Sequence, residues 1–152
     1  MGLLDFLFGK TKTIEDGFFG TLRLIEFKES SKDYFEGNKY FGPAKRSIEL
    51  IINGGIPGPS EKQKQFFRDV ERSYGLIIEK SAPLIIDEFR NWKPEFTIMD
   101  FDQEFWPVHM SIPKIDEGDT TWEMAFETSH DQNHHITITY KNFEAKEILI
   151  DG

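Results

Sequence analysis

The chain has 152 residues, a length typical of one domain, and its hydrophobic content of 38% excludes disorder as the main state. Its 15 Phe, 3 Trp and 4 Tyr residues predict a core built from large rings. The lack of cysteine excludes disulfides, zinc–thiolate sites and thiol nucleophiles, and it fits a reducing compartment. We therefore expect a single cytoplasmic domain spanning residues 1–152.

The first ten residues are apolar but too few to cross a membrane. Large apolar residues lie between Leu3 and Phe8, with no early basic residue and no small-residue cleavage site, so no secretory signal peptide is predicted. We expect a short helix over residues 2–9 that docks on the body of the protein. Contact with a membrane surface is the alternative.

Residues 18–53 have the composition of strands. Phe18–Phe27 is rich in aromatic and branched residues and predicts the first strand. Tyr34–Phe41 contains the turn signal Gly37-Asn38, so it is either a tight hairpin or a strand with a bulge. Arg46–Asn53 alternates apolar and polar residues, which predicts a strand with one buried face.

A helical block follows over residues 60–92. Ser60 with Gln63 three residues later is a capping-box pattern, which predicts a helix that begins at Glu61. Apolar residues then recur at helical spacing. Pro83 lacks an amide hydrogen and suits a first turn, so we expect a kink or a new helix capped near Ser81. Pro94 ends the block.

The rest of the chain again predicts strands. These are Phe105–Ile112, Thr121–Thr128, His135–Tyr140 and Ile148–Ile150. Pro107 should confine the start of the first of them to a sheet edge or an irregular entry. The connections are too short for parallel crossovers, so residues 104–150 should form an antiparallel meander. The order of elements predicts an α+β fold with antiparallel sheets of about six to seven strands and the helical block packed on one face.

Acidic residues are concentrated at the end of the chain. The net charge is −9, and residues 95–152 carry thirteen Asp or Glu against three Lys. Such a region repels phosphate backbones and attracts basic partners, so nucleic-acid binding is not expected. The plainer interpretation is a solvated acidic surface.

The histidine and carboxylate clusters do not predict a metal site or a cofactor. His130, His134 and His135 lie near Asp131, but neighbouring residues of a strand face opposite ways, which favours solvated turn histidines. Asp100, Asp102 and Glu104 would line one edge of an extended segment. They lack the ordered ligands and the turn glycine of a calcium loop.

Known catalytic motifs are also missing. Gly54, Gly55 and Gly58 precede a helix, but the Lys-Ser or Lys-Thr of a phosphate loop does not follow, which favours a simple strand-to-helix turn. No Gly-x-Ser-x-Gly elbow occurs.

A family resemblance lies in the last two thirds of the chain. It rests on the Gly-Pro-Ser helix opening, Trp122–Glu127, His135–Thr139 and the closing Ile148–Gly152. These segments resemble small bacterial proteins of unknown function, some of which are similar to proteins that neutralise secreted toxins. The resemblance implies an immunity-type role and brings no catalytic residue.

We therefore expect a non-catalytic protein-binding module whose acidic C-terminal sheet docks a basic partner, in the manner of an immunity-type inhibitor. Trp106 and Trp122 are either buried anchors of that contact or core residues. The alternative is a small hydrolytic or metal-dependent enzyme that uses His109, His130 or His134 with nearby carboxylates. The predicted partner-binding residues are Asp100, Asp102, Glu104, Asp116, Glu117, Asp119, Glu123 and Glu127.

Overall fold

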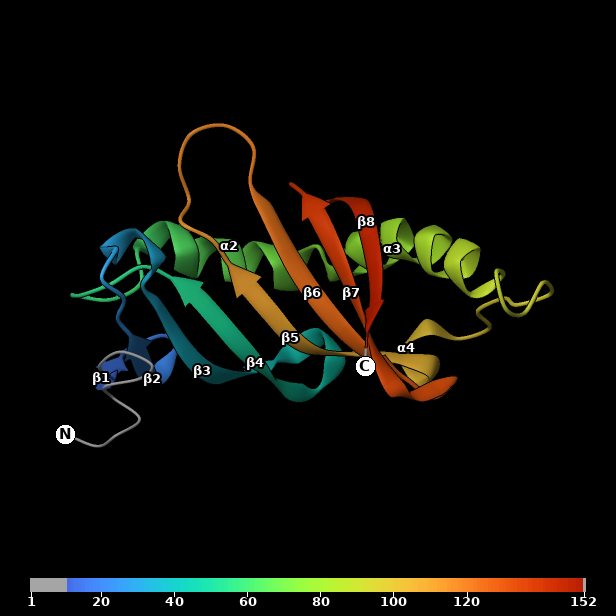
Figure 1. Ribbon diagram of the computed structural model, residues 1–152, viewed down its shortest axis with the longest axis horizontal. Helices are drawn as coiled ribbons and strands as arrows, with labels where there is room; N and C mark the ends of the chain where they lie inside the picture. Colours follow the sequence, from blue (N-terminus) through green and yellow to red (C-terminus); the bar gives the residue numbers. More distant parts are fainter. Residues whose placement is uncertain (1–10, 152) are drawn as a thin grey trace.

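The fold is α+β, with one eight-stranded sheet and two long helices packed on one of its faces (Figure 1). The structure is a computed structural model that describes residues 11–151, so the helix expected over residues 2–9 lies outside the described residues. Short 3₁₀ turns occur at Ser30–Lys32 and Gly42–Ala44. The strands and helices are, in chain order, β1 Thr11–Asp16, β2 Gly20–Ile25, β3 Tyr34–Phe41, β4 Arg46–Asn53, α2 Glu61–Arg72, α3 Tyr74–Phe89, α4 Phe101–Glu104, β5 Phe105–Ile112, β6 Thr121–Thr128, β7 Asp131–Lys141 and β8 Glu144–Asp151.

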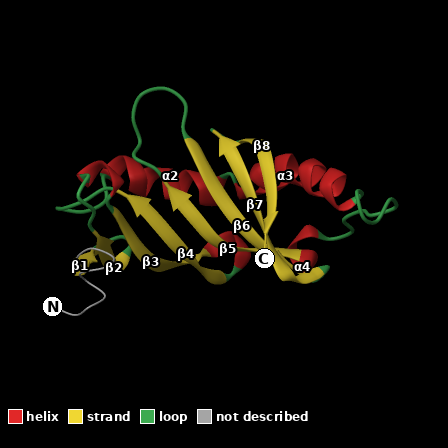
Figure 2. Cartoon of the chain, viewed as in Figure 1, coloured by secondary structure: helices red, strands yellow, loops and turns green. Residues whose placement is uncertain are grey.

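The strands lie side by side in chain order. All neighbouring pairs are antiparallel except β4 and β5, which are parallel and joined through α2 and α3. A parallel pair needs a long crossover, and the helical block supplies it. The two meanders therefore form one continuous sheet, with both helices on the same side of it (Figure 2).

Strands β4, β5 and β6 have the bounds predicted from the sequence. β3 also has the range given from the sequence, Tyr34–Phe41. By contrast, β2 is shorter than Phe18–Phe27, whereas β7 and β8 extend beyond their apolar centres. Strand β1 was not predicted, because Ile14 is its only large apolar residue. Pairing along the whole of β2 holds β1 in the sheet.

Gly37 lies in the middle of β3, where the residues form one strand rather than a hairpin and pair with β4 without a bulge. Residues Tyr34–Phe41 pair continuously with β4 as one strand. A Cβ atom at Gly37 would lie 2.5 Å from the Cδ2 atom of Leu22. The glycine is therefore explained by the close approach of a β2 side chain, a contact that local sequence does not reveal.

The predicted capping box of α2 is confirmed. The Ser60 hydroxyl accepts the Gln63 amide at 3.1 Å, and the Gln63 side chain accepts the Ser60 amide at 3.0 Å. The amide group of Gln63 also donates to the carbonyl oxygens of Asn53 and Pro113, at 2.8 and 3.0 Å. This buried side chain thus joins the start of α2 to the ends of β4 and β5.

The new helix considered near Ser81 is wrong. α3 runs through Pro83 from Tyr74 to Phe89, and the helical block is interrupted at Ser73 instead. Ser81 is buried and donates to the Ile77 carbonyl at 2.6 Å, so its hydroxyl caps no new helix. One continuous face of α3, including Ile77, Ser81 and Ile85, is buried, and this packing outweighs the local cost of the proline.

The irregular entry predicted at Pro107 is confirmed, although β5 lies inside the sheet. The register with β6 shifts between Pro107 and His109, and β4 pairs with β5 only from His109 onward. The missing amide hydrogen of Pro107 therefore lies where no β4 partner is required.

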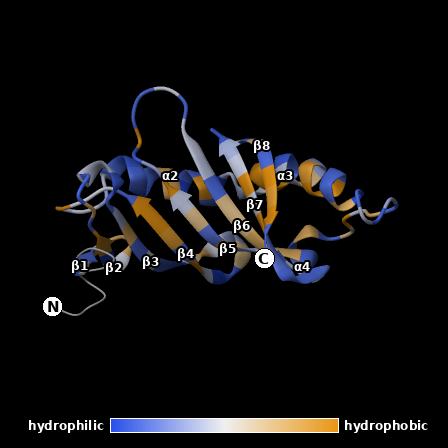
Figure 3. Ribbon diagram, in the orientation of Figure 1, coloured by the Kyte–Doolittle hydropathy of each residue, from blue (hydrophilic) through white to orange (hydrophobic). Residues whose placement is uncertain are grey.

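The core lies between the helices and the sheet and is rich in rings. Phe67 of α2 makes edge-to-face contacts with Phe18, Phe19 and Phe41 at centroid distances of 5.9 to 6.0 Å. Phe66 contacts Trp122 of β6 in the same way. The helix crossover thus packs on both halves of the sheet. Strand β4, which lies beneath it, has a run of consecutive hydrophobic residues near its end (Figure 3).

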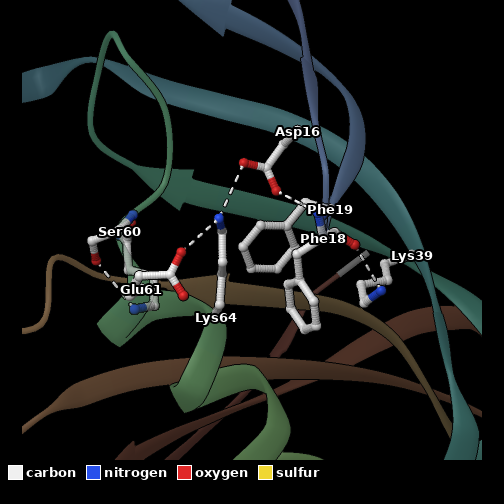
Figure 4. A network of polar contacts seen from close by, with 8 residues as sticks. Asp16, Phe18, Phe19, Lys39, Ser60, Glu61 and Lys64 are labelled. Atoms are coloured by element: carbon white, nitrogen blue, oxygen red, sulfur yellow. Dashed lines mark hydrogen bonds and ion pairs between the residues drawn. The ribbon is translucent and has the colours of Figure 1, made fainter.

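A polar network holds the β1–β2 hairpin against α2 (Figure 4). The Asp16 carboxylate accepts the backbone amides of Phe18 and Phe19 at 2.9 and 2.8 Å and pairs with Lys64 at 3.6 Å. Lys64 also pairs with Glu61. Burial raises the pKa of Asp16, but these hydrogen bonds outweigh it, and the net effect is a lowered pKa.

Candidate functional site

The face of the sheet opposite the helices carries polar residues from adjacent strands. Strand register places one row of residues directly across β4 to β8. The row contains Glu49, His109, Ala125, Thr137 and Leu149. Because alternate residues of each strand point to the same face, these side chains share the open face.

A second row lies beside the first. His135 pairs with Asp151 across β7 and β8, and its Nε2 atom lies 3.5 Å from the Glu127 Oε1 atom. Glu123 lies on the same face, opposite Thr139. Carboxylates from β4, β6 and β8 therefore surround the two imidazoles.

A shallow hollow of about 360 Å³ opens between these rows. Ala125 lies on its floor, and the small side chain leaves room between His109 and Thr137. The residues that line it include three carboxylates and two histidines but no lysine or arginine. They are Glu49, Val108, His109, Ala125, Glu127, His135, Thr137 and Asp151.

His109 is the half-buried member of this site. Burial lowers its pKa below the ordinary value of 6.5, and the nearby Glu49 and Glu123 carboxylates oppose the shift only in part. The imidazole is therefore mainly neutral at neutral pH, and the hollow keeps its negative charge.

Arg23 and Lys141 do not line the hollow and are engaged elsewhere. Arg23 of β2 pairs with Glu36 of β3. Lys141 at the end of β7 pairs with Asp119 at 3.2 Å. The negative charge around Glu49, Glu127 and Asp151 is thus not neutralised by either of these cations.

The eight predicted partner-binding residues fall in three places. Only Glu123 and Glu127 lie on the open face. Asp116, Glu117 and Asp119 lie in the loop between β5 and β6, which projects beyond the strands (Figure 1). The third group lies at α4: Asp100 directly precedes this helix, and Asp102 and Glu104 are part of it.

The α4 group does not form the extended acidic edge considered from the sequence, because Phe101–Glu104 is a helical turn. The Glu104 carboxylate accepts the backbone amides of Met99 and Asp100 at 2.8 and 2.6 Å, and it lies 2.7 Å from His130 Nε2. The hydrogen bond from the Asp100 amide is the largest cause that lowers the pKa of Glu104. Glu104 is thus engaged within the chain, holding α4 against the β6–β7 turn.

The histidines considered from the sequence, His130, His134 and His135, contact three separate carboxylates, and His135 lies 3.5 Å from Glu127. His130 contacts Glu104, and the Nδ1 atom of His134 lies 2.7 Å from Asp131. His109 lies on another strand. Within residues 11–151, no group of three or more His, Asp or Glu side chains is arranged to hold a metal ion.

The two candidate tryptophan anchors differ. Trp122 is 1% exposed, stacks on Tyr140 at a centroid distance of 4.5 Å and donates to the Asn142 carbonyl, so it is a core residue. Trp106 is half-buried, and the Arg46 guanidinium lies 5.4 Å above its ring.

Sequence reasoning missed Glu49, His109 as part of an acidic face, and Asp151. Only Glu49 could have been noticed from the sequence, because it lies on the polar face of a predicted strand. The parallel pairing of β4 with β5 brings Glu49 opposite His109, and that pairing follows from tertiary structure.

Comparison of the chain with protein-family models, with curated proteins and with solved structures finds no match. No helix among residues 11–151 is long and apolar enough to span a bilayer.

Proposed function

We propose that the chain is a non-catalytic protein-binding module that docks a basic surface of another protein on the open face of its sheet. The supporting observation is the hollow at Ala125, which is lined by Glu49, Glu127 and Asp151 without a lysine or arginine. A lysine or arginine side chain of the partner enters this hollow and pairs with the carboxylates. The partly desolvated floor strengthens such pairs relative to fully exposed ones.

The projecting loop contributes at longer range. Asp116 and Glu117 lie beyond the sheet, where their charge reaches an approaching partner before contact. The loop therefore raises the association rate, while the hollow sets the dissociation rate.

An immunity-type inhibitor is the specific form of this function that we favour. A toxin that acts on nucleic acid or on anionic membranes needs a basic surface, and an acidic sheet face covers such a surface by charge complementarity.

Affinity capture at two salt concentrations tests the proposal. The protein should retain a basic partner from lysate of its own cell at low salt and release it at about 1 M salt, where exposed ion pairs are screened. Retention that does not depend on salt contradicts the proposal.

A pair of charge-matched variants makes the test specific. Glu49→Gln/Glu127→Gln removes two carboxylates from the hollow, and we expect about tenfold or more faster dissociation of the captured partner. The control Glu79→Gln/Glu95→Gln removes two exposed carboxylates outside the open face and should change little. Equal effects of the two variants would show attraction by total charge rather than docking on this face.

A further inference from the structure

β8 is an edge strand in the described sheet. It pairs with β7 on one side only, at the end of the strand order. Backbone amide and carbonyl groups on its outer side have no sheet partner, and such an edge accepts another strand unless it is blunted.

The two halves of β8 differ in this respect. The register with β7 changes between Thr139, which pairs with Glu147, and Tyr140, which pairs with Ala145. Lys146 is the extra residue of this irregularity. A bulge that carries a lysine is a common protection of an edge. The other half, Ile148–Asp151, pairs regularly with β7 and has no such protection.

A groove runs along this unprotected half. Its volume is about 440 Å³, and it lies between β8 and the end of α3, which extends past the sheet edge (Figure 1). Trp92 and Leu149, which are 57% and 60% exposed, provide apolar surface. Glu88 provides a carboxylate, whereas the Asp131 carboxylate is already engaged by His134, which also lines the groove.

We propose that Ile148–Asp151 receives an extended basic segment of a partner protein as an additional strand. Backbone hydrogen bonds to the β8 edge hold the segment, and alternate side chains point to the same face. Apolar side chains of the segment contact Trp92 and the β8 isoleucines, and a lysine or arginine side chain pairs with Glu88. This site shares Asp151 with the hollow at Ala125, but it lies on the outer edge of β8 and does not require that the hollow binds.

A second copy of the chain fits this edge poorly. Antiparallel self-pairing that places Ile148 opposite Ile150 also places Glu147 opposite Asp151, which sets like charges directly across from one another. Both copies carry a net charge of −9. A basic segment has neither conflict.

The test uses the intact protein and a synthetic peptide of about ten residues that alternates lysine and valine. We expect binding that changes Trp92 fluorescence and slows hydrogen exchange of the β8 amides. A peptide with the same side chains but N-methylated at every backbone amide should bind about tenfold or more weakly, because neither of its edges keeps a donor for β8. Equal binding of both peptides overturns the proposal.

Two variants on α3 locate the contact. Glu88→Lys should weaken binding of the lysine–valine peptide about tenfold or more, whereas Glu79→Lys, on the same helix outside the groove, should leave it unchanged. Self-association of the free protein through β8, or equal loss in both variants, contradicts the proposal. The hollow variant Glu49→Gln/Glu127→Gln should still bind this peptide, so failure of the edge site and failure of the docking face are separable.

Discussion

Two buried tyrosines differ in what their hydroxyl groups contact. The Tyr140 hydroxyl lies 2.6 Å from the Ser81 hydroxyl. Because Ser81 uses its single proton for the Ile77 carbonyl, Tyr140 is the donor. The Tyr74 hydroxyl makes no hydrogen bond to another described residue and lines a hollow beside Asp102. Burial raises the pKa of both tyrosines, so both stay neutral.

Replacing each tyrosine by phenylalanine should separate these cases. Tyr140→Phe removes a buried hydrogen bond, and we expect the free energy of unfolding to fall by about 1 kcal/mol. Tyr74→Phe removes no such bond and should change it by less than about 0.5 kcal/mol. Urea titrations measure both values. A larger loss for Tyr74→Phe than for Tyr140→Phe would refute this assignment.

His109 should make stability depend on pH. Its folded-state pKa lies below 6.5, so the unfolded chain binds the proton first as the pH falls. The stabilisation is complete above pH 6.5 and is lost as the pH falls from there through the folded-state pKa. His109→Gln should therefore flatten the pH dependence of the unfolding free energy as the pH falls below 6.5. If the unfolding free energy of the His109 variant still depended on pH as steeply as that of the unchanged protein, other groups would be the cause of that dependence.

At the scale of elements, a few side chains join segments that are remote in sequence. Asp16 fixes the turn between β1 and β2 and pairs with Lys64 of α2. Gln63 joins α2 to β4 and to the residue after β5. These contacts set the position of the crossover over the sheet, and hence the strand pairing that forms the open face.

Asp16→Ala should loosen the β1–β2 hairpin. It removes hydrogen bonds from two backbone amides and the ion pair with Lys64, and we expect a loss of about 2 kcal/mol in unfolding free energy. The lowered pKa of Asp16 stabilises the fold above its ordinary value of 3.8, and this contribution is lost as the pH falls through the folded-state pKa. The unfolding free energy of the variant should therefore fall less steeply than that of the unchanged protein as the pH is lowered.

Glu61→Gln is the matched control for that variant. The Glu61 side chain is 84% exposed and pairs with the same lysine, so its removal should cost less than about 0.5 kcal/mol. Urea denaturation at neutral pH measures the loss of unfolding free energy in each of the two variants. Equal losses would mean that the lysine pair, rather than the turn, is what Asp16 stabilises.

At the scale of the molecule, the α2–α3 crossover unites two meanders into one sheet. Phe67 packs on Phe18, Phe19 and Phe41 from the first half, and the neighbouring Phe66 packs on Trp122 from the second. One core therefore lies beneath both halves.

Phe67→Ala should destabilise the whole molecule, by about 3 to 5 kcal/mol, because it leaves a cavity among these rings. Far-ultraviolet circular dichroism and tryptophan fluorescence should report the same midpoint, since we expect a single cooperative domain. Two separate transitions would instead show that the halves unfold independently.

The candidate site could be predicted only in part. The sequence indicated an acidic C-terminal region, and Glu123 and Glu127 do lie on the open face. It could not show that Glu104 is engaged by backbone amides and His130, or that Glu49, from outside that region, joins the same face. Charge counted along a chain does not say which surface each carboxylate reaches.

Local patterns determined the α+β class, the strands β4 to β6 and the capped start of α2, because alternation and capping act within a few residues. Tertiary structure decided the rest: pairing placed the polar β1 in the sheet, and packing carried α3 through Pro83. It also set β4 parallel to β5 and so assembled the open face. These outcomes depend on contacts between residues far apart in the chain, whose free energy no local pattern contains.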